Sequence, residues 1–141
     1  MHGIGDRAMT LAELRLDIVI LACAVSAGIH GALVPDHFRD GVGAGIGFVV
    51  ATALLAVLAV VLTRNQSQIA LAATAAVFIG LILSYAFAIT TGLPVLHPAV
   101  EAVDRLALFT KAVEAAGLIT ATSLMRQPSL ALFTQPKGTP T

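Results

Sequence analysis

Three histidines and three acids along this 141-residue chain are of the residue types that bind divalent metal ions. They fall in two polar regions of the chain, and the six candidate ligands are His30, His37, Asp40, His97, Glu101 and Asp104. Imidazole nitrogens combined with carboxylate oxygens suit borderline ions such as zinc or copper(II). A divalent metal site is therefore expected if the fold brings the two regions together. The alternative for the residues around Asp36 and Arg39 is a solvated loop with local salt bridges.

His30 differs from the other candidates because it lies inside an apolar stretch, among the small residues Gly28, Gly31 and Ala32. Small neighbours admit a second helix, so one interpretation is a structural hydrogen bond between helices. The other is ligand binding or proton handling, for which imidazole is suited near neutral pH. Sequence leaves both interpretations open.

Lys111 and Glu114 are charged residues within another apolar stretch. A charge at the bilayer centre costs about 2.5–3.5 kcal/mol on insertion scales, so such residues usually face a partner or a cavity. Residues three apart on a helix can neutralise each other. Alternatively, the two belong to a polar path for a proton or a solute. Helical periodicity also places Glu101 and Asp104 on the same side as this pair, which predicts one polar stripe turned toward the bundle interior.

Four apolar stretches must position these residues, at about 18–34, 45–63, 69–91 and 106–125. Each is about long enough to cross a bilayer as a helix. The chain is 57% hydrophobic and 11% charged, with a mean hydropathy of +0.92. Soluble domains carry about 25% charged residues. We therefore predict an all-α integral membrane protein, a bundle of four transmembrane helices that passes repeatedly through the cell membrane.

The ends of the helices are marked by proline, glycine and polar residues. Pro35 is expected to end the first helix, because proline lacks an amide donor and disfavours helical geometry at Val34. Gly92 followed by Pro94 is expected to end the third helix. The polar residues at 64–68 predict a tight hairpin between antiparallel helices. The membrane domain is predicted to span 1–125 with helices at about 11–34, 43–63, 68–91 and 99–125, followed by a disordered tail at 126–141.

Lysine and arginine predict the orientation, because they are enriched in cytoplasmic flanks of membrane helices. With four spans, the termini and the middle loop share one side, which carries Arg7, Arg15, Arg64, Arg126 and Lys137. The opposite side carries Arg39 and Arg105. Both termini are therefore predicted to be cytoplasmic, which places the candidate metal ligands at the outer face.

Small residues predict how the helices pack. Glycines alternate at the start of the second helix, at Gly41, Gly43, Gly45 and Gly47. The third helix carries a small-residue stripe of Ala73, Ala76, Gly80, Ser84 and Ala88. In lipid, close backbone approach over small residues provides the packing, and the same faces would serve a homo-oligomer or a larger membrane complex. The formal net charge of zero disfavours nucleic acid, so membrane lipid is the expected surrounding partner.

Two segments resemble a group of small uncharacterised four-span bacterial membrane proteins. The first has the pattern His-x4-Pro-x-His-x2-acid, formed by His30, Pro35, His37 and Asp40. The second is a Thr-x-Gly-Leu-Pro turn, formed by Thr90, Gly92, Leu93 and Pro94. This chain has Ile89 where such proteins often have an arginine, which argues against an anion site there. The resemblance covers about a quarter of the chain, implies four spans and brings no known activity.

The leading expectation is a non-enzymatic metal-binding or accessory membrane protein that uses a histidine and carboxylate cluster at its outer face. One alternative is a structural subunit of a larger membrane complex. Another is a small oligomeric transporter in which His30, Lys111 and Glu114 form the path. The chain lacks a Gly-x-Ser-x-Gly motif, and its single cysteine, Cys23, excludes a Cys-x-x-Cys motif. Serine hydrolase and dithiol redox chemistry are therefore disfavoured.

Overall fold

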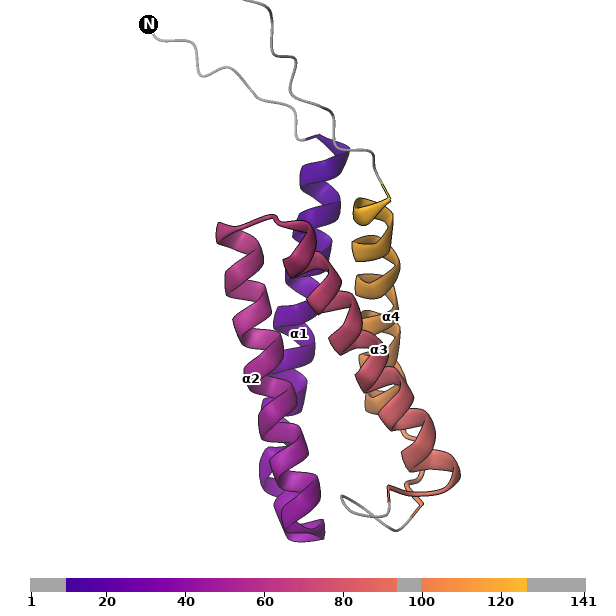
Figure 1. Ribbon diagram of the computed structural model, residues 1–141. Helices are drawn as coiled ribbons and strands as arrows, with labels where there is room; N and C mark the ends of the chain where they lie inside the picture. Colours follow the sequence, from indigo (N-terminus) through magenta and orange to yellow (C-terminus); the bar gives the residue numbers. More distant parts are fainter. Residues whose placement is uncertain (1–9, 94–99, 127–141) are drawn as a thin grey trace, which may run out of the picture.

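The chain folds into four helices in a computed structural model that describes residues 10–93 and 100–126. The helices are α1 (Leu11–Asp40), α2 (Val42–Arg64), α3 (Gln68–Thr90) and α4 (Arg105–Met125). They form two antiparallel hairpins, α1–α2 and α3–α4 (Figure 1). Among the helix pairs that pack against each other, contacts are most extensive between α1 and α2 and fewest between α2 and α3. The hairpins therefore diverge toward the end of the bundle where α1 meets α2, which we call the open end (Figure 1). The predicted all-α fold is confirmed.

Side-chain caps explain where α1 and α3 begin. Thr10 and Glu13 form a capping box at the start of α1. The Ser67 hydroxyl accepts a hydrogen bond of 3.2 Å from the backbone amide of Ala70 at the start of α3. Such side chains satisfy amide groups that have no partner within the first helical turn. The tight hairpin expected between the second and third helices is confirmed as the short connection that ends at Ser67.

The first helix does not end at Pro35, as expected, but continues to Asp40. A proline inside a helix removes one backbone hydrogen bond, and a neighbouring helix can offset that cost. Here α1 packs along α2, and the backbone bonding resumes after the proline, since the amide of Gly41 donates to the carbonyl of His37 at 3.0 Å. Gly41 is the single residue between the two helices. His37 and Asp40 therefore lie on a helix rather than in a loop.

The fourth helix begins at Arg105, several residues later than the expected start near residue 99. Asp104 is the N-cap of α4. Its carboxylate accepts a hydrogen bond of 2.8 Å from the backbone amide of Ala107, which fixes the start of the helix at Arg105. Glu101 precedes the helix, and its amide donates to the carbonyl of Ala88 at 3.0 Å. The expected polar stripe on one helix is therefore restricted to Lys111 and Glu114.

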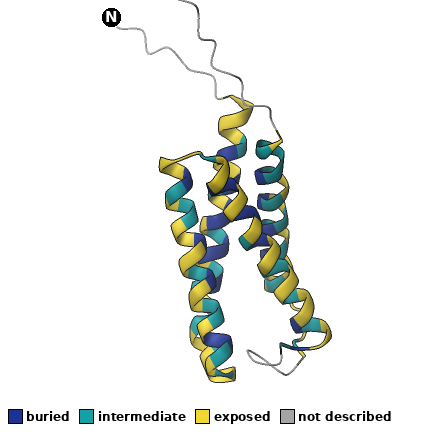
Figure 2. Cartoon of the chain, in the orientation of Figure 1, coloured by how far each residue is buried: buried dark blue, intermediate teal, exposed yellow. Residues whose placement is uncertain are grey.

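Three of the helices, α1, α2 and α3, are long and apolar enough to cross a membrane. The outward faces of the bundle are exposed along its length (Figure 2). They carry large apolar side chains, such as Leu21, Val57, Leu83 and Ile119. An apolar surface of this extent is unsuited to water and suited to lipid. The protein is therefore membrane-embedded.

The core draws on all four helices, and its fully buried members include Leu55 of α2 and Phe78 of α3. A glycine on α4, Gly117, makes the close approach of α4 to Phe78 possible. A Cβ atom at Gly117 would lie 2.6 Å from the Phe78 ring and 2.8 Å from the Cβ of Ala22. Close packing over a small residue is thus present, but at a glycine that the sequence motifs do not single out.

The expected glycine and alanine faces have a more limited role within the chain. Gly45 lies directly under the ring of Phe38, where an added Cβ would be 2.3 Å from the nearest ring carbon. Most of the small-residue stripe on α3 is exposed, and its buried member is Ala88. That stripe does not mediate helix packing among the residues described.

Candidate functional site

A buried polar cluster joins α1 to α4, and it consists of Ser26, His30, Lys111 and Glu114. Glu114 is completely buried. One of its carboxylate oxygens accepts a hydrogen bond of 2.8 Å from the Ser26 hydroxyl, and the other accepts one of 2.5 Å from the Lys111 ammonium. Both charges are therefore neutralised inside the bundle, as expected from the three-residue spacing.

His30 completes the cluster from α1. Its Nδ1 donates a hydrogen bond of 2.9 Å to the backbone carbonyl of Ser26, and its Nε2 lies 3.9 Å from a carboxylate oxygen of Glu114. His30 is buried. The hydrogen bond of His30 therefore lies within α1, and its contact with α4 is the approach to Glu114, whereas the hydrogen bond that joins the two helices is that of Ser26 with Glu114.

Lys111 extends the cluster to α3. Its ammonium donates to the backbone carbonyl of Leu81 at 3.4 Å and lies 5.6 Å from the centroid of the Tyr85 ring. The Lys111 side chain is 17% exposed. The Lys111 ammonium is thus bonded both to Glu114 on α4 and to the backbone of α3.

A cavity of about 340 Å³ opens next to the cluster, between the two hairpins. All four helices contribute to its walls, and α2 does so with Ala44, Gly47, Phe48 and Ala51. The walls are mainly apolar. The polar and ionisable residues in the lining are His30, His37, Ser84, Tyr85, Glu101, Asp104, Thr110 and Lys111.

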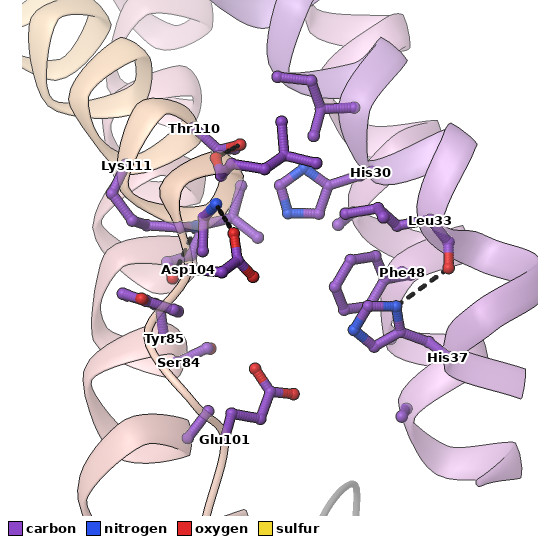
Figure 3. Close-up of a pocket in the computed structure, with 18 of the residues that line it drawn as sticks. His30, Leu33, His37, Phe48, Ser84, Tyr85, Glu101, Asp104, Thr110 and Lys111 are labelled. Atoms are coloured by element: carbon purple, nitrogen blue, oxygen red, sulfur yellow. Dashed lines mark hydrogen bonds between the residues drawn. The ribbon is translucent and has the colours of Figure 1, made fainter. Parts of the chain in front are cut away.

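The polar lining is divided between two facing walls (Figure 3). His30 and His37 project from α1 on one side, whereas Tyr85, Glu101, Asp104 and Lys111 lie on the other. His30 and His37 are the ionisable residues of the α1 wall, which has no acidic side chain in the lining. The opposite wall carries the two acids in addition to the internally paired lysine.

The structure brings together some of the expected metal ligands. His30, His37, Glu101 and Asp104 line one cavity, whereas Asp40 is exposed at the end of α1 and does not line it. His97 lies outside the described residues. Within residues 10–93 and 100–126, no group of three or more histidine, cysteine or acidic side chains is arranged to hold a metal ion.

His37 is held in a defined orientation. Its Nδ1 donates a hydrogen bond of 3.0 Å to the carbonyl of Leu33, and its ring stacks on Phe48 with centroids 3.5 Å apart. Near the same helix end, Arg39 and Asp36 form an exposed ion pair. The solvated-salt-bridge interpretation is therefore confirmed for that pair but does not describe His37.

Tyr85 is a site residue that the sequence analysis did not single out. It lines the cavity from α3. Its hydroxyl is buried, and among the described residues it is the one buried side-chain nitrogen or oxygen without a hydrogen-bond partner. Tyr85 is the single tyrosine of an apolar chain, so the sequence alone could have indicated it as a candidate site residue. Ser26 offers a similar signal, because it lies one helical turn before His30.

A second, apolar depression of about 220 Å³ lies between α2 and α3, and we call it the lateral groove. Its lining consists of Gly47, Val50, Ala51, Leu54, Val77, Gly80 and Leu81. Gly47, Ala51 and Leu81 also line the cavity, so the two spaces adjoin. The lateral groove follows the contact between α2 and α3, which is less extensive than that of α1 with α2 or of α3 with α4.

No protein-family model, curated protein or solved structure matches this chain.

Proposed function

We propose that this protein is a non-enzymatic membrane protein that binds a small lipid-soluble molecule in the cavity at the open end. The observation that carries the proposal is a cavity of about 340 Å³ walled by four helices, mainly apolar and with few polar groups. Small-molecule sites typically have this size and character. The accessory role expected from the sequence is compatible with such binding.

The same proposal includes a fourth span and a defined orientation. α4 has 21 residues, which at about 1.5 Å per residue covers roughly the 30 Å hydrocarbon thickness. Its two central charges pair with each other inside the bundle, which lowers the cost of placing them in lipid. The distribution of arginine and lysine supports cytoplasmic termini, and the open end then faces the outer side.

Filling the cavity is expected to displace its occupant. Ala51 is buried and lines both the cavity and the lateral groove, so Ala51→Phe introduces a ring into the shared wall. Ala56→Phe is the matched control, because Ala56 is exposed on the same helix. Native mass spectrometry of protein released from lipid nanodiscs should show a small-molecule adduct on the wild type. The adduct should fall at least about tenfold for Ala51→Phe, corresponding to about 1.4 kcal/mol.

The control decides how that result is interpreted. Ala56→Phe should retain the adduct, and circular dichroism should show the same helix content for both variants. An adduct that is absent from the wild type, or is equally abundant with Ala51→Phe, would contradict binding in the cavity.

A divalent metal ion is the second candidate occupant, favoured by the shared position of His37, Glu101 and Asp104 on the cavity walls. In this proposal His97 supplies a further ligand, and zinc or copper is the expected ion. His37→Ala should then weaken zinc binding about tenfold or more in a calorimetric titration, which is about 1.4 kcal/mol. Asp40→Ala should leave binding unchanged, because Asp40 does not line the cavity. Equal zinc binding by wild type and His37→Ala would exclude His37 as a ligand and contradict a metal site in the cavity.

A further inference from the structure

The buried hydroxyl of Tyr85 has unused hydrogen-bonding capacity at the cavity wall. A buried polar group without a partner is destabilising, and most buried polar groups in folded proteins have a partner. The described residues supply none for this oxygen. Tyr85 lines the cavity, so a ligand group that reaches this oxygen from there would supply the missing partner.

Lys111 offers a second donor beside Tyr85. An ammonium carries three N–H groups. Among the described residues, Glu114 and the carbonyl of Leu81 take two of them. The side chain also lines the cavity, with its ammonium near the Tyr85 ring. An incoming atom that satisfies both side chains must accept hydrogen bonds, because an ammonium can only donate.

The charges around the cavity favour a neutral acceptor. The positive charge of Lys111 is already offset by Glu114 at 2.5 Å. Glu101 and Asp104 line the same wall, and the facing wall adds the two histidines His30 and His37. A carboxylate or phosphate bound at Lys111 would be a second anion beside one ammonium that Glu114 already pairs, and like charges repel. A carbonyl oxygen has the required acceptor without that repulsion.

The lateral groove accounts for the other end of such a molecule. It adjoins the cavity through Gly47, Ala51 and Leu81, and its lining is apolar. Its rim includes Val50 and Leu54, which are half exposed on a surface that faces lipid. Because the groove continues the cavity, a hydrocarbon chain attached to a head group in the cavity would leave through it.

We propose that the ligand is a neutral, carbonyl-bearing amphiphile whose carbonyl oxygen is bound by Tyr85 and Lys111 and whose hydrocarbon chain lies in the lateral groove. This inference rests on the proposed function, since it names the ligand class of the same cavity. A quinone ring and a fatty-acyl ester both present this chemistry.

Binding of four decyl probes to nanodisc-embedded protein, measured by native mass spectrometry, tests the head group. The probes are decyl-1,4-benzoquinone, 1-decanoylglycerol, decylbenzene and decyltrimethylammonium. At least one carbonyl probe should bind about tenfold more tightly than decylbenzene, since a hydrogen-bonded group contributes about 1–2 kcal/mol. The tighter of the two carbonyl probes distinguishes a quinone from an ester. Tyr85→Phe keeps the ring, removes the hydroxyl and should reduce the preference to about threefold or less.

A second variant tests the path of the chain. Gly80 lines the groove, and a Cβ there would meet no atom within 4 Å in the described part of the chain, so Gly80→Leu adds bulk at the groove without a clash at its first carbon. It should weaken decyl-1,4-benzoquinone or 1-decanoylglycerol, whichever the wild type prefers, about tenfold. The same head group with a methyl in place of the decyl chain should be unaffected.

The outcomes separate this inference from the proposed function. If all four probes bind equally and Ala51→Phe weakens all of them, the cavity binds ligands and the head-group assignment is wrong. Preferred binding of decyltrimethylammonium would also overturn the neutral head group. A carbonyl preference that stays at about tenfold with Tyr85→Phe would overturn the role of the hydroxyl. If no probe binds and the wild type carries no adduct, the proposed function itself fails.

Discussion

Replacing Glu114 with alanine is expected to lower the free energy of unfolding by about 3–5 kcal/mol, because it leaves a buried ammonium without its partner. Glu114 is completely buried, and its two carboxylate oxygens bond Ser26 and Lys111. The variant therefore loses contacts to α1 and within α4 at once. Stability can be measured by circular dichroism during unfolding in mixed micelles of mild detergent and sodium dodecyl sulfate.

A double variant distinguishes the lost pair from a general packing defect. Replacement of a buried ion pair by apolar side chains of similar size is often neutral or stabilising. The combination Lys111→Met with Glu114→Leu should therefore recover most of the stability that Glu114→Ala loses. Asp40→Ala is a control for an exposed acid and should change stability by at most about 0.5 kcal/mol. If the double variant is as unstable as the single one, the unpaired lysine is not the cause.

Gly117→Leu is expected to lower the free energy of unfolding by about 1–3 kcal/mol or more through steric overlap. Even the first carbon of a side chain would lie 2.6 Å from the Phe78 ring and 2.8 Å from the Cβ of Ala22. Phe78 is fully buried, and a Cβ moves only with its backbone, so neither neighbour yields easily. Inserting extra carbons into a packed core costs about 1–3 kcal/mol and sometimes more. Gly117→Ala should already destabilise, and leucine should separate α4 from the rest of the bundle.

Gly28→Ala is the matched control for a helical glycine. A Cβ at Gly28 would meet no atom within 4 Å among the residues described, and alanine is favoured over glycine in helices by about 1 kcal/mol. This variant should be as stable as the wild type or more so in the same micelle unfolding assay. Equal stability losses at Gly28 and Gly117 would contradict the packing described for α4.

The helices were predictable from sequence because the length of an apolar stretch and the residues that begin or end a helix are local properties of the chain. The second and third helices match their predicted bounds within one residue. The end of α1 was not predictable in the same way, since packing against α2 outweighs the local effect of Pro35. The start of α4 depends on whether Asp104 caps a helix or lies within one, and sequence allows both.

The candidate site was predictable only in part. The pairing of Lys111 with Glu114 follows from their spacing along one helix, and the structure confirms it. The contact between Ser26 and Glu114 joins residues of different helices, so it depends on how α1 and α4 are rotated about their axes. The exposed position of Asp40 and the buried hydroxyl of Tyr85 likewise depend on tertiary packing. For this reason the sequence could not show that Asp40 lies outside the cavity that His30, His37, Glu101 and Asp104 line.

A structure of the protein determined in lipid nanodiscs, with the preferred decyl probe added, tests the central claim most directly. The account predicts α2 and α3 apart at the open end, with elongated density running from the Tyr85 hydroxyl into the lateral groove. Direct packing of α2 against α3, with side chains filling the space and density for the probe found only among the surrounding lipids, would contradict it.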